Sequence, residues 1–190
     1  MLKLKNNNGY SLFELFIALL ITSVMLASGY SFYVKMHNST IAQADISDMQ
    51  QNSRATLHEI VKTARMAGYK IGSHTPYIIN GDTLTVFYSD TQPVDTFMFY
   101  LEDYSGSELA QFGSLEASLI PKKMMIKHNS ESAAIYTDYI KSLAYTAVDA
   151  STLQITLVVQ ASKADEDFAS NEGIRDYSCT QQVNLRNINL

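Results

Sequence analysis

The sequence of 190 residues has little of several features that commonly indicate a protein's function. It has one cysteine, Cys179, three prolines and no tryptophan. A single cysteine excludes both an intramolecular disulfide and a multi-cysteine metal site. A hydrophobic content of 46% excludes a largely disordered chain. The formal net charge of −5 leaves no basic surplus to neutralise phosphates, so we expect no nucleic acid as the main partner.

Motifs of enzymes and metalloproteins are also missing. The sequence has no glycine-rich phosphate loop and no serine nucleophile elbow. The histidines lie too far apart to form a ligand-spaced pair: His37, His58, His74 and His128. The only dense acidic group consists of Asp165, Glu166, Asp167 and Glu172. This group lacks the full calcium-loop pattern with its central glycine, so a solvated loop is favoured over a calcium site. We therefore expect no catalytic residue, no cofactor and no metal centre.

An unbroken apolar run near the N-terminus is the strongest feature that is present. A polar leader, residues 1–9, has Lys3 and Lys5 as its only charges, and the 20 residues from Leu15 to Val34 carry no charge. As a helix these residues would extend about 30 Å at roughly 1.5 Å per residue. That length matches the hydrocarbon thickness of a bilayer. The basic leader favours a cytoplasmic N-terminus and places the chain beyond Lys35 across the membrane.

Glu14 is the only charged residue between Tyr10 and Val34. A carboxylate inside a membrane helix costs a few kcal/mol, so its presence indicates a function. A cleaved secretory signal peptide and a plain signal anchor are two alternatives that account for the lysines and the apolar core. Neither alternative accounts for Glu14.

The segment 9–15, GYSLFEL, resembles the class III leader junction of type IV prepilins and type II secretion pseudopilins. The resemblance implies that prepilin peptidase cleaves between Gly9 and Tyr10 and methylates the new amino group of Tyr10. It also implies that Glu14 pairs with the N-terminal amine of a neighbouring subunit, since such pairing stabilises both charges in low dielectric. Tyrosine at the first mature position departs from the family pattern, in which phenylalanine or methionine is more common.

Beyond Lys35 the sequence predicts an amphipathic continuation of the helix up to residue 68. Its apolar stripe consists of Ala42, Ile46, Met49, Ser53, Leu57, Ile60, Ala64 and Ala67. Alternating segments then predict about six strands, at 83–88, 96–101, 124–127, 139–148, 152–159 and 179–186, with a hairpin turn at 149–151. Residues 103–118 and 162–176 are expected to be loops. The predicted fold is α+β, with an antiparallel sheet packed on the helix stripe.

This organisation divides the chain into a leader (1–9), a transmembrane and assembly helix (10–34), its amphipathic continuation (35–68) and a β-rich head (69–190). Four short strings occur in the order RMAGY (65–69), DTLTV (82–86), FYL (99–101) and TQQVNLRN (180–187). Together with the leader they resemble the PilW family of minor pilins, which is related to the J-type minor pseudopilins. The resemblance implies a type IV pilin fold.

The resemblance to the PilW family also implies a role and partners. A minor pilin of this kind primes type IV pilus assembly and sits in a tip complex with other minor pilins, the major pilin and, in some cases, a tip adhesin. It lies in the inner membrane with a periplasmic head before assembly, and at the pilus tip afterwards. A minor pseudopilin of a type II secretion system is one alternative. A membrane-anchored periplasmic binding or scaffold protein that never polymerises is the other.

Aromatic residues in and beside the segment 103–134 are candidates for contacts between heads: Tyr100, Tyr104, Phe112, Tyr136 and Tyr139. We select Tyr104 and Phe112 as the possible interface, because aromatic side chains bury a large area at low entropic cost. The alternative is that these residues line the sheet. Cys179 is expected either to be a buried small hydrophobe or to form a disulfide with another chain.

Overall fold

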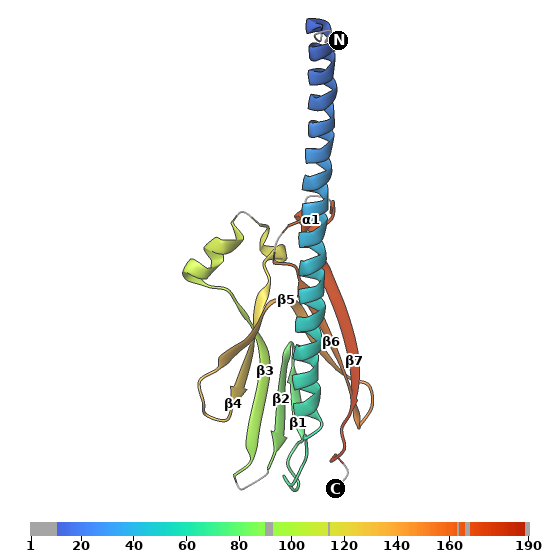
Figure 1. Ribbon diagram of the computed structural model, residues 1–190. Coiled ribbons are helices and arrows are strands. Elements are labelled where there is room, and N and C mark those ends of the chain that lie inside the picture. The colour runs from blue at the N-terminus through green and yellow to red at the C-terminus, as the bar shows by residue number, and fades with distance from the viewer. Residues whose placement is uncertain (1–10, 90–92, 114, 163, 166–167, 189–190) are drawn as a thin grey trace, which may run out of the picture. The chain divides into compact units, whose positions relative to one another are not determined.

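The computed structural model describes residues 11–89, 93–113, 115–162, 164–165 and 168–188 (Figure 1). Over these residues the chain forms one long α-helix followed by seven β-strands and three short 3₁₀ helices. This is the α+β architecture that the sequence predicts. The chain divides into two compact units, Met1–Gln43 and Ala44–Leu190, and the helix runs through the boundary between them.

Helix α1 covers Leu12–Ala64 and is 53 residues long. Its part beyond Ala44 confirms the predicted apolar stripe, because Met49, Ser53, Leu57, Ile60 and Ala64 are all buried. Buried threonines widen this stripe beyond the predicted positions. Small and β-branched side chains at this spacing give the helix one continuous face that packs against the sheet.

The helix ends at Ala64, earlier than the predicted end at Ala67, and a turn follows up to Lys70. Gly68 is required in this turn for two reasons. Its φ is +82°, and a Cβ atom at this position would lie 2.6 Å from the carbonyl oxygen of Asn187. Its N–H donates to the carbonyl oxygen of Phe87 at 2.9 Å, which joins the helix end to the sheet. A side chain here would force the turn away from Asn187 and strain this hydrogen bond.

The sheet contains all seven strands in sequence order, and every neighbouring pair is antiparallel. The strands are β1 (Tyr77–Asn80), β2 (Thr83–Tyr88), β3 (Asp95–Asp103), β4 (Lys122–His128), β5 (Ala134–Ala147), β6 (Thr152–Gln160) and β7 (Asp176–Asn184). Each of the predicted strands is present. Strand β1 was not predicted, and β7 begins at Asp176 rather than at the predicted Cys179.

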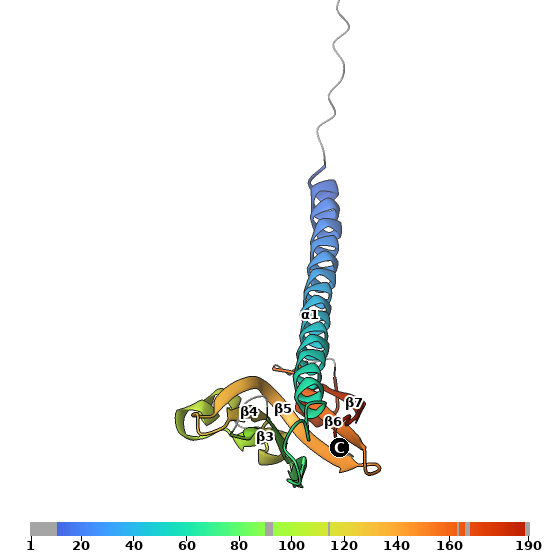
Figure 2. The same cartoon turned by 90° about the horizontal axis from the view of Figure 1, so that it is seen from below.

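The core lies between the sheet and the stripe on α1. Strand partners that face each other across the ladder place their side chains on the same face, as in the pairs Leu84 with Phe99, Leu143 with Leu157 and Leu153 with Val183. All of these side chains are buried in one cluster with Leu57 and Ile60 of the helix. Figure 2 shows the strands curling on one side of the C-terminal part of α1.

The connection between β3 and β4 corrects the prediction of a plain loop at 103–118. It contains two 3₁₀ helices, η1 (Gly106–Phe112) and η2 (Ala117–Leu119). Lys123 of β4 holds η1 against the sheet through an ion pair with Glu108 at 2.8 Å, although the Lys123 side chain is only 8% exposed. The predicted loop at 162–176 is largely confirmed, with a third 3₁₀ helix, η3 (Asn171–Gly173), within it.

Candidate assembly helix and head surfaces

The first part of α1 is apolar and exposed along its whole length. Every residue from Ser11 to Ile41 is exposed, including large side chains such as Phe13 at 70% and Leu20 at 65%. Among the described residues, α1 is the one helix that is long and apolar enough to cross a membrane. An apolar surface of this extent marks a contact with lipid or with another protein.

The serine and threonine hydroxyl groups between Leu15 and Val34 are satisfied by the helix itself. Thr22, Ser28 and Ser31 donate to the carbonyl oxygens four residues earlier, at 2.7, 2.8 and 3.0 Å. Ser23 donates to the carbonyl oxygen of Leu20 at 2.8 Å. In hydrocarbon an unsatisfied polar group costs several kcal/mol. The segment 15–34 is therefore compatible with lipid despite its four serine and threonine residues.

Glu14 caps the start of the helix. Its Oε2 accepts a hydrogen bond from the backbone N–H of Ser11 at 3.0 Å, and Ser11 Oγ accepts one from the N–H of Phe13 at 3.3 Å. This reciprocal arrangement is of the capping-box type, in which two unpaired N–H groups at the helix start are satisfied. The carboxylate also lies at the positive end of the helix dipole.

The capping role of Glu14 was missed in the sequence, although the spacing Ser-x-x-Glu at positions 11–14 is its signature. Ser11 is the only described residue that is hydrogen-bonded to the Glu14 side chain, and it engages one of the two carboxylate oxygens. The other oxygen can still accept a cationic partner. The predicted cleavage and methylation residues, Gly9 and Tyr10, lie outside the described residues.

The predicted interface aromatics form a cluster within the head. The rings of Tyr104 and Phe112 lie 4.8 Å apart, and Phe112 meets Tyr139 edge-on at 6.2 Å. Tyr104 is only 9% exposed, and its hydroxyl donates to Asp138 Oδ1 at 3.1 Å. Burial, with a smaller contribution from the Asp138 carboxylate, raises the pKa of Tyr104. Of the predicted pair, Tyr104 is buried and only Phe112 is partly exposed.

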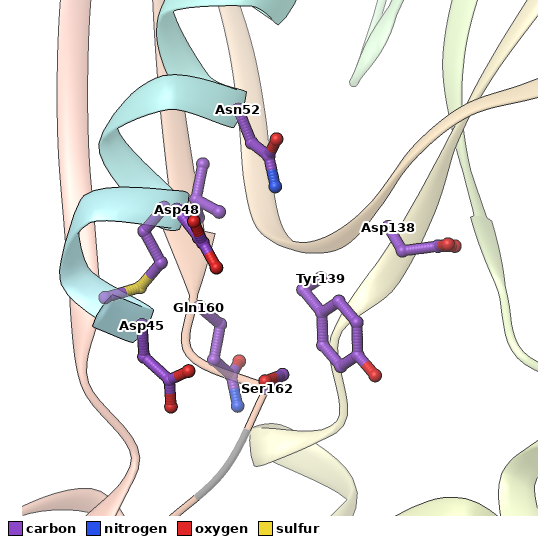
Figure 3. Close-up of a pocket in the computed structure, with 9 residues that line it drawn as sticks. Asp45, Asp48, Asn52, Asp138, Tyr139, Gln160 and Ser162 are labelled. Atoms are coloured by element: carbon purple, nitrogen blue, oxygen red, sulfur yellow. The ribbon is translucent and has the colours of Figure 1, made fainter. Parts of the chain in front are cut away.

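A pocket of about 170 Å³ opens beside this cluster (Figure 3). Its polar lining residues come from three segments far apart in the sequence. They are Asp45, Asp48 and Asn52 of α1, Asp138 and Tyr139 of β5, and Gln160 and Ser162 at the end of β6. No motif in the sequence marks this pocket. Tyr139 has a φ of +59°, a strained value for a bulky residue, at an irregular point in the pairing of β5.

The remaining candidates have structural surroundings. In the acidic loop, Asp165 Oδ2 binds Arg175 Nη2 at 2.7 Å, and the Arg175 guanidinium lies over the ring of Phe168 at 4.6 Å. Glu166 and Asp167 fall outside the described residues. Cys179 is a free, half-buried thiol opposite Leu157 that packs against the core cluster. Across the described ranges, no three His, Cys, Asp or Glu side chains are grouped to hold a metal ion.

No family model, curated protein or solved structure matches this chain. The architecture itself is pilin-like. It combines a long N-terminal helix, exposed and apolar in its first part, with an antiparallel sheet that packs on the helix stripe beyond Ala44.

Proposed function

We propose that this chain is a minor pilin of the PilW kind, which primes type IV pilus assembly and sits in a tip complex. Prepilin peptidase would cleave it after Gly9 and methylate Tyr10. The main support for this proposal is the exposed apolar first part of α1 with the Glu14 carboxylate at its start. A plain membrane anchor requires the apolar residues, and it would gain only a helix cap from a carboxylate that is costly in lipid. Assembly would also use the second carboxylate oxygen, which can pair with the N-terminal amine of a neighbouring subunit.

The two parts of α1 support assembly by the helix. The exposed part is soluble in lipid and can exchange lipid contacts for contacts with the helices of other subunits. The buried part belongs to the core of the head. We infer that the subunit lies in the inner membrane with its head in the periplasm, and that other minor pilins, the major pilin and a tip adhesin are its partners.

Cleavage of the leader is tested by mass spectrometry of the N-terminal peptide. We expect the mature protein to begin at Tyr10 and to carry one N-methyl group. The variant Gly9→Trp is the control, because a bulky residue before the cleavage site should leave the leader attached. A mature start after Gly29, or an uncut chain in cells that process their pilins, would refute the proposal.

The role of Glu14 is tested by three matched variants. Glu14→Gln removes the charge but keeps an oxygen that can accept the hydrogen bond from Ser11, whereas Ser11→Ala removes part of the cap and keeps the charge. Glu14→Ala removes both contributions of the carboxylate. We expect Glu14→Gln and Glu14→Ala to lower the amount of protein in sheared pili at least tenfold, the equivalent of about 1.4 kcal/mol.

Ser11→Ala should enter pili nearly as well as the wild type, since a lost cap costs about 0.5–2 kcal/mol of local helix stability without removing the carboxylate. Membrane insertion and cleavage of all three variants should be intact. Equal incorporation of Glu14→Gln and wild type would eliminate the intersubunit pairing and leave the cap as the function of Glu14.

The kind of machine is tested by purifying filaments and measuring their composition by quantitative proteomics. A tip subunit should be rare relative to the major pilin, and its loss should sharply reduce surface pili. Finding the chain as the dominant subunit would refute the minor role. Finding it only in a type II secretion pseudopilus would show that the chain is a minor pseudopilin of that system instead.

A further inference from the structure

The pocket between α1, β5 and β6 is not used by the proposed function, and its polar lining consists of oxygen-bearing side chains. All of its residues belong to the unit Ala44–Leu190. Carboxylates come from Asp45 and Asp48, an amide from Gln160 and a hydroxyl from Ser162. Figure 3 shows these four side chains around the same opening. Apart from the thioether of Met49, the lining lacks the imidazole and thiolate donors that zinc and copper prefer.

Gln160 is the strongest indication that the pocket holds a ligand. The residue is only 2% exposed, and its Oε1 is buried without a hydrogen-bond partner among the described residues. Its Nε2 donates to the carbonyl oxygen of Leu119 at 2.6 Å. This hydrogen bond fixes the orientation of the amide, because a flipped amide would place two acceptors against each other. The unsatisfied atom is therefore an acceptor, which a cation or a donor group must satisfy.

The two aspartates add negative charge without compensation. Asp45 and Asp48 are three residues apart and so lie on the same face of α1. Neither forms an ion pair with a described residue. The third carboxylate of the lining, Asp138, differs, since it accepts the hydroxyl of Tyr104 and turns away from the other two (Figure 3).

We propose that this pocket binds Ca²⁺. Asp45 and Asp48 would supply two carboxylates that balance its charge, and Gln160 Oε1 would supply a carbonyl oxygen. Asn52 and Ser162 are further oxygen donors at the rim, and water would complete the six to eight ligands that Ca²⁺ takes. Mg²⁺ demands a stricter octahedral arrangement, so an open pocket with donors from separate segments favours Ca²⁺. With only two unpaired carboxylates, we expect an affinity of about 10⁻⁴–10⁻³ M, as in extracellular calcium modules.

The test uses the full chain in detergent micelles with Tb³⁺ as a luminescent substitute for Ca²⁺. Tyr139 lines the pocket and can transfer excitation energy to a bound Tb³⁺, and the chain has no tryptophan to compete. We expect saturable Tb³⁺ emission that millimolar Ca²⁺ displaces and equal Mg²⁺ does not. Tyr139→Phe should lower the emission of the bound ion while leaving Ca²⁺ binding, measured by calorimetry, unchanged.

Matched variants assign the ligands. Asp45→Asn and Asp48→Asn should each weaken Ca²⁺ binding at least tenfold, whereas Asp138→Asn, which removes the carboxylate that turns away, should change it less than threefold. Gln160→Leu should likewise weaken binding, because it removes the carbonyl oxygen at the unsatisfied position. Circular dichroism of each variant reports whether the head is folded.

Two results would overturn the proposal. One is the absence of saturable, Ca²⁺-displaceable emission from the wild-type chain. The other is binding that Asp45→Asn and Asp48→Asn leave unchanged. Neither result bears on leader cleavage or on Glu14, so the proposed function is tested separately.

Discussion

The two parts of α1 differ in where their apolar side chains are placed. Up to Ile41 every residue is exposed, and large apolar residues occur on all sides of the helix. Beyond Ala44 the apolar residues form one stripe, which the sheet buries, while charged residues occupy the other faces. One continuous helix thus carries an all-round apolar surface in one part and an amphipathic surface in the other.

This difference shows what each part requires for stability. The amphipathic part finds its apolar partner within the same chain, so its side chains contribute to the free energy of unfolding of the head. The exposed part finds none among the described residues of its unit, and its side chains contribute only when lipid or another helix covers them. The two parts should therefore respond independently to substitution.

The largest effect is expected for isoleucines compared across the two parts. Ile60 is 0% exposed and Ile21 is 51% exposed. Ile60→Ala should lower the free energy of unfolding of the head by about 2–5 kcal/mol, since it leaves a cavity. Ile21→Ala should leave it unchanged. Urea unfolding of the full chain in micelles, followed by tyrosine fluorescence, measures both, and a comparable loss for Ile21→Ala would contradict the independence of the two parts.

A charge placed in the exposed part should give the converse result. Leu20→Arg should reduce stable membrane association, because arginine at the centre of a membrane helix costs about 2.5–3.5 kcal/mol. The unfolding midpoint of the head should not move. Membrane flotation of the variant, with Gln43→Arg outside the apolar run as control, measures the effect. Full membrane association of Leu20→Arg would show that this part of the helix does not lie in lipid.

The turn that closes the amphipathic part should tolerate only glycine. Gly68→Ala should destabilise the head by about 1–3 kcal/mol through its positive φ, and the contact with Asn187 should add to this loss. Gly72→Ala is the control, because its φ is +65° but no atom lies within 4 Å of the added Cβ. Thermal unfolding should give a clearly lower melting temperature for Gly68→Ala than for Gly72→Ala. Equal melting temperatures would show that the close contact with Asn187 relaxes.

The smallest effect concerns charge, since the ion pairs between described residues all lie beyond Ala44. The hydrogen bond between Lys123 and Glu108 lowers the pKa of Glu108 and raises that of Lys123. The stabilisation by Glu108 is present above the ordinary glutamate pKa and is lost as the pH falls through the lowered value. The stabilisation by Lys123 is present below the ordinary lysine pKa, and it is lost as the pH rises through the raised pKa of Lys123.

Glu108→Gln should therefore lower the melting temperature slightly near neutral pH, and the difference from wild type should shrink at both extremes of pH. Differential scanning calorimetry across the pH range measures the difference. A constant difference at every pH would mean that the charge of Glu108 contributes nothing and that only its packing matters.

Features with strong local periodicity could be predicted from the sequence. The stripe on α1 repeats every three or four residues, and the hairpin between β5 and β6 follows from its turn, where Asp149 Oδ1 accepts the N–H of Ser151 at 2.7 Å. Strand β1 was missed because its four residues are too few to show alternation. The 3₁₀ helices η1 and η2 were missed because they are short and lack a repeating pattern.

The candidate sites were predictable only where their residues are close in the sequence. Glu14 was selected from its place in the segment 9–15, GYSLFEL, whereas its hydrogen bond to Ser11 required the structure. The acidic pocket could not be predicted, because its residues come from segments near 45, 138 and 160 that only the folded sheet brings together. The burial of Tyr104 likewise depends on η1, which packs Phe112 over it.

The order of the strands has a consequence for how fast the head folds. Each strand pairs with the strand that precedes or follows it along the chain, so no pairing in the sheet requires a long crossover. Low sequence separation between contacts lowers the entropy lost before contacts form, and such topologies fold rapidly for their size. The head can therefore build its sheet hairpin by hairpin, whereas the packing of β6 and β7 on α1 joins segments that lie far apart in the sequence.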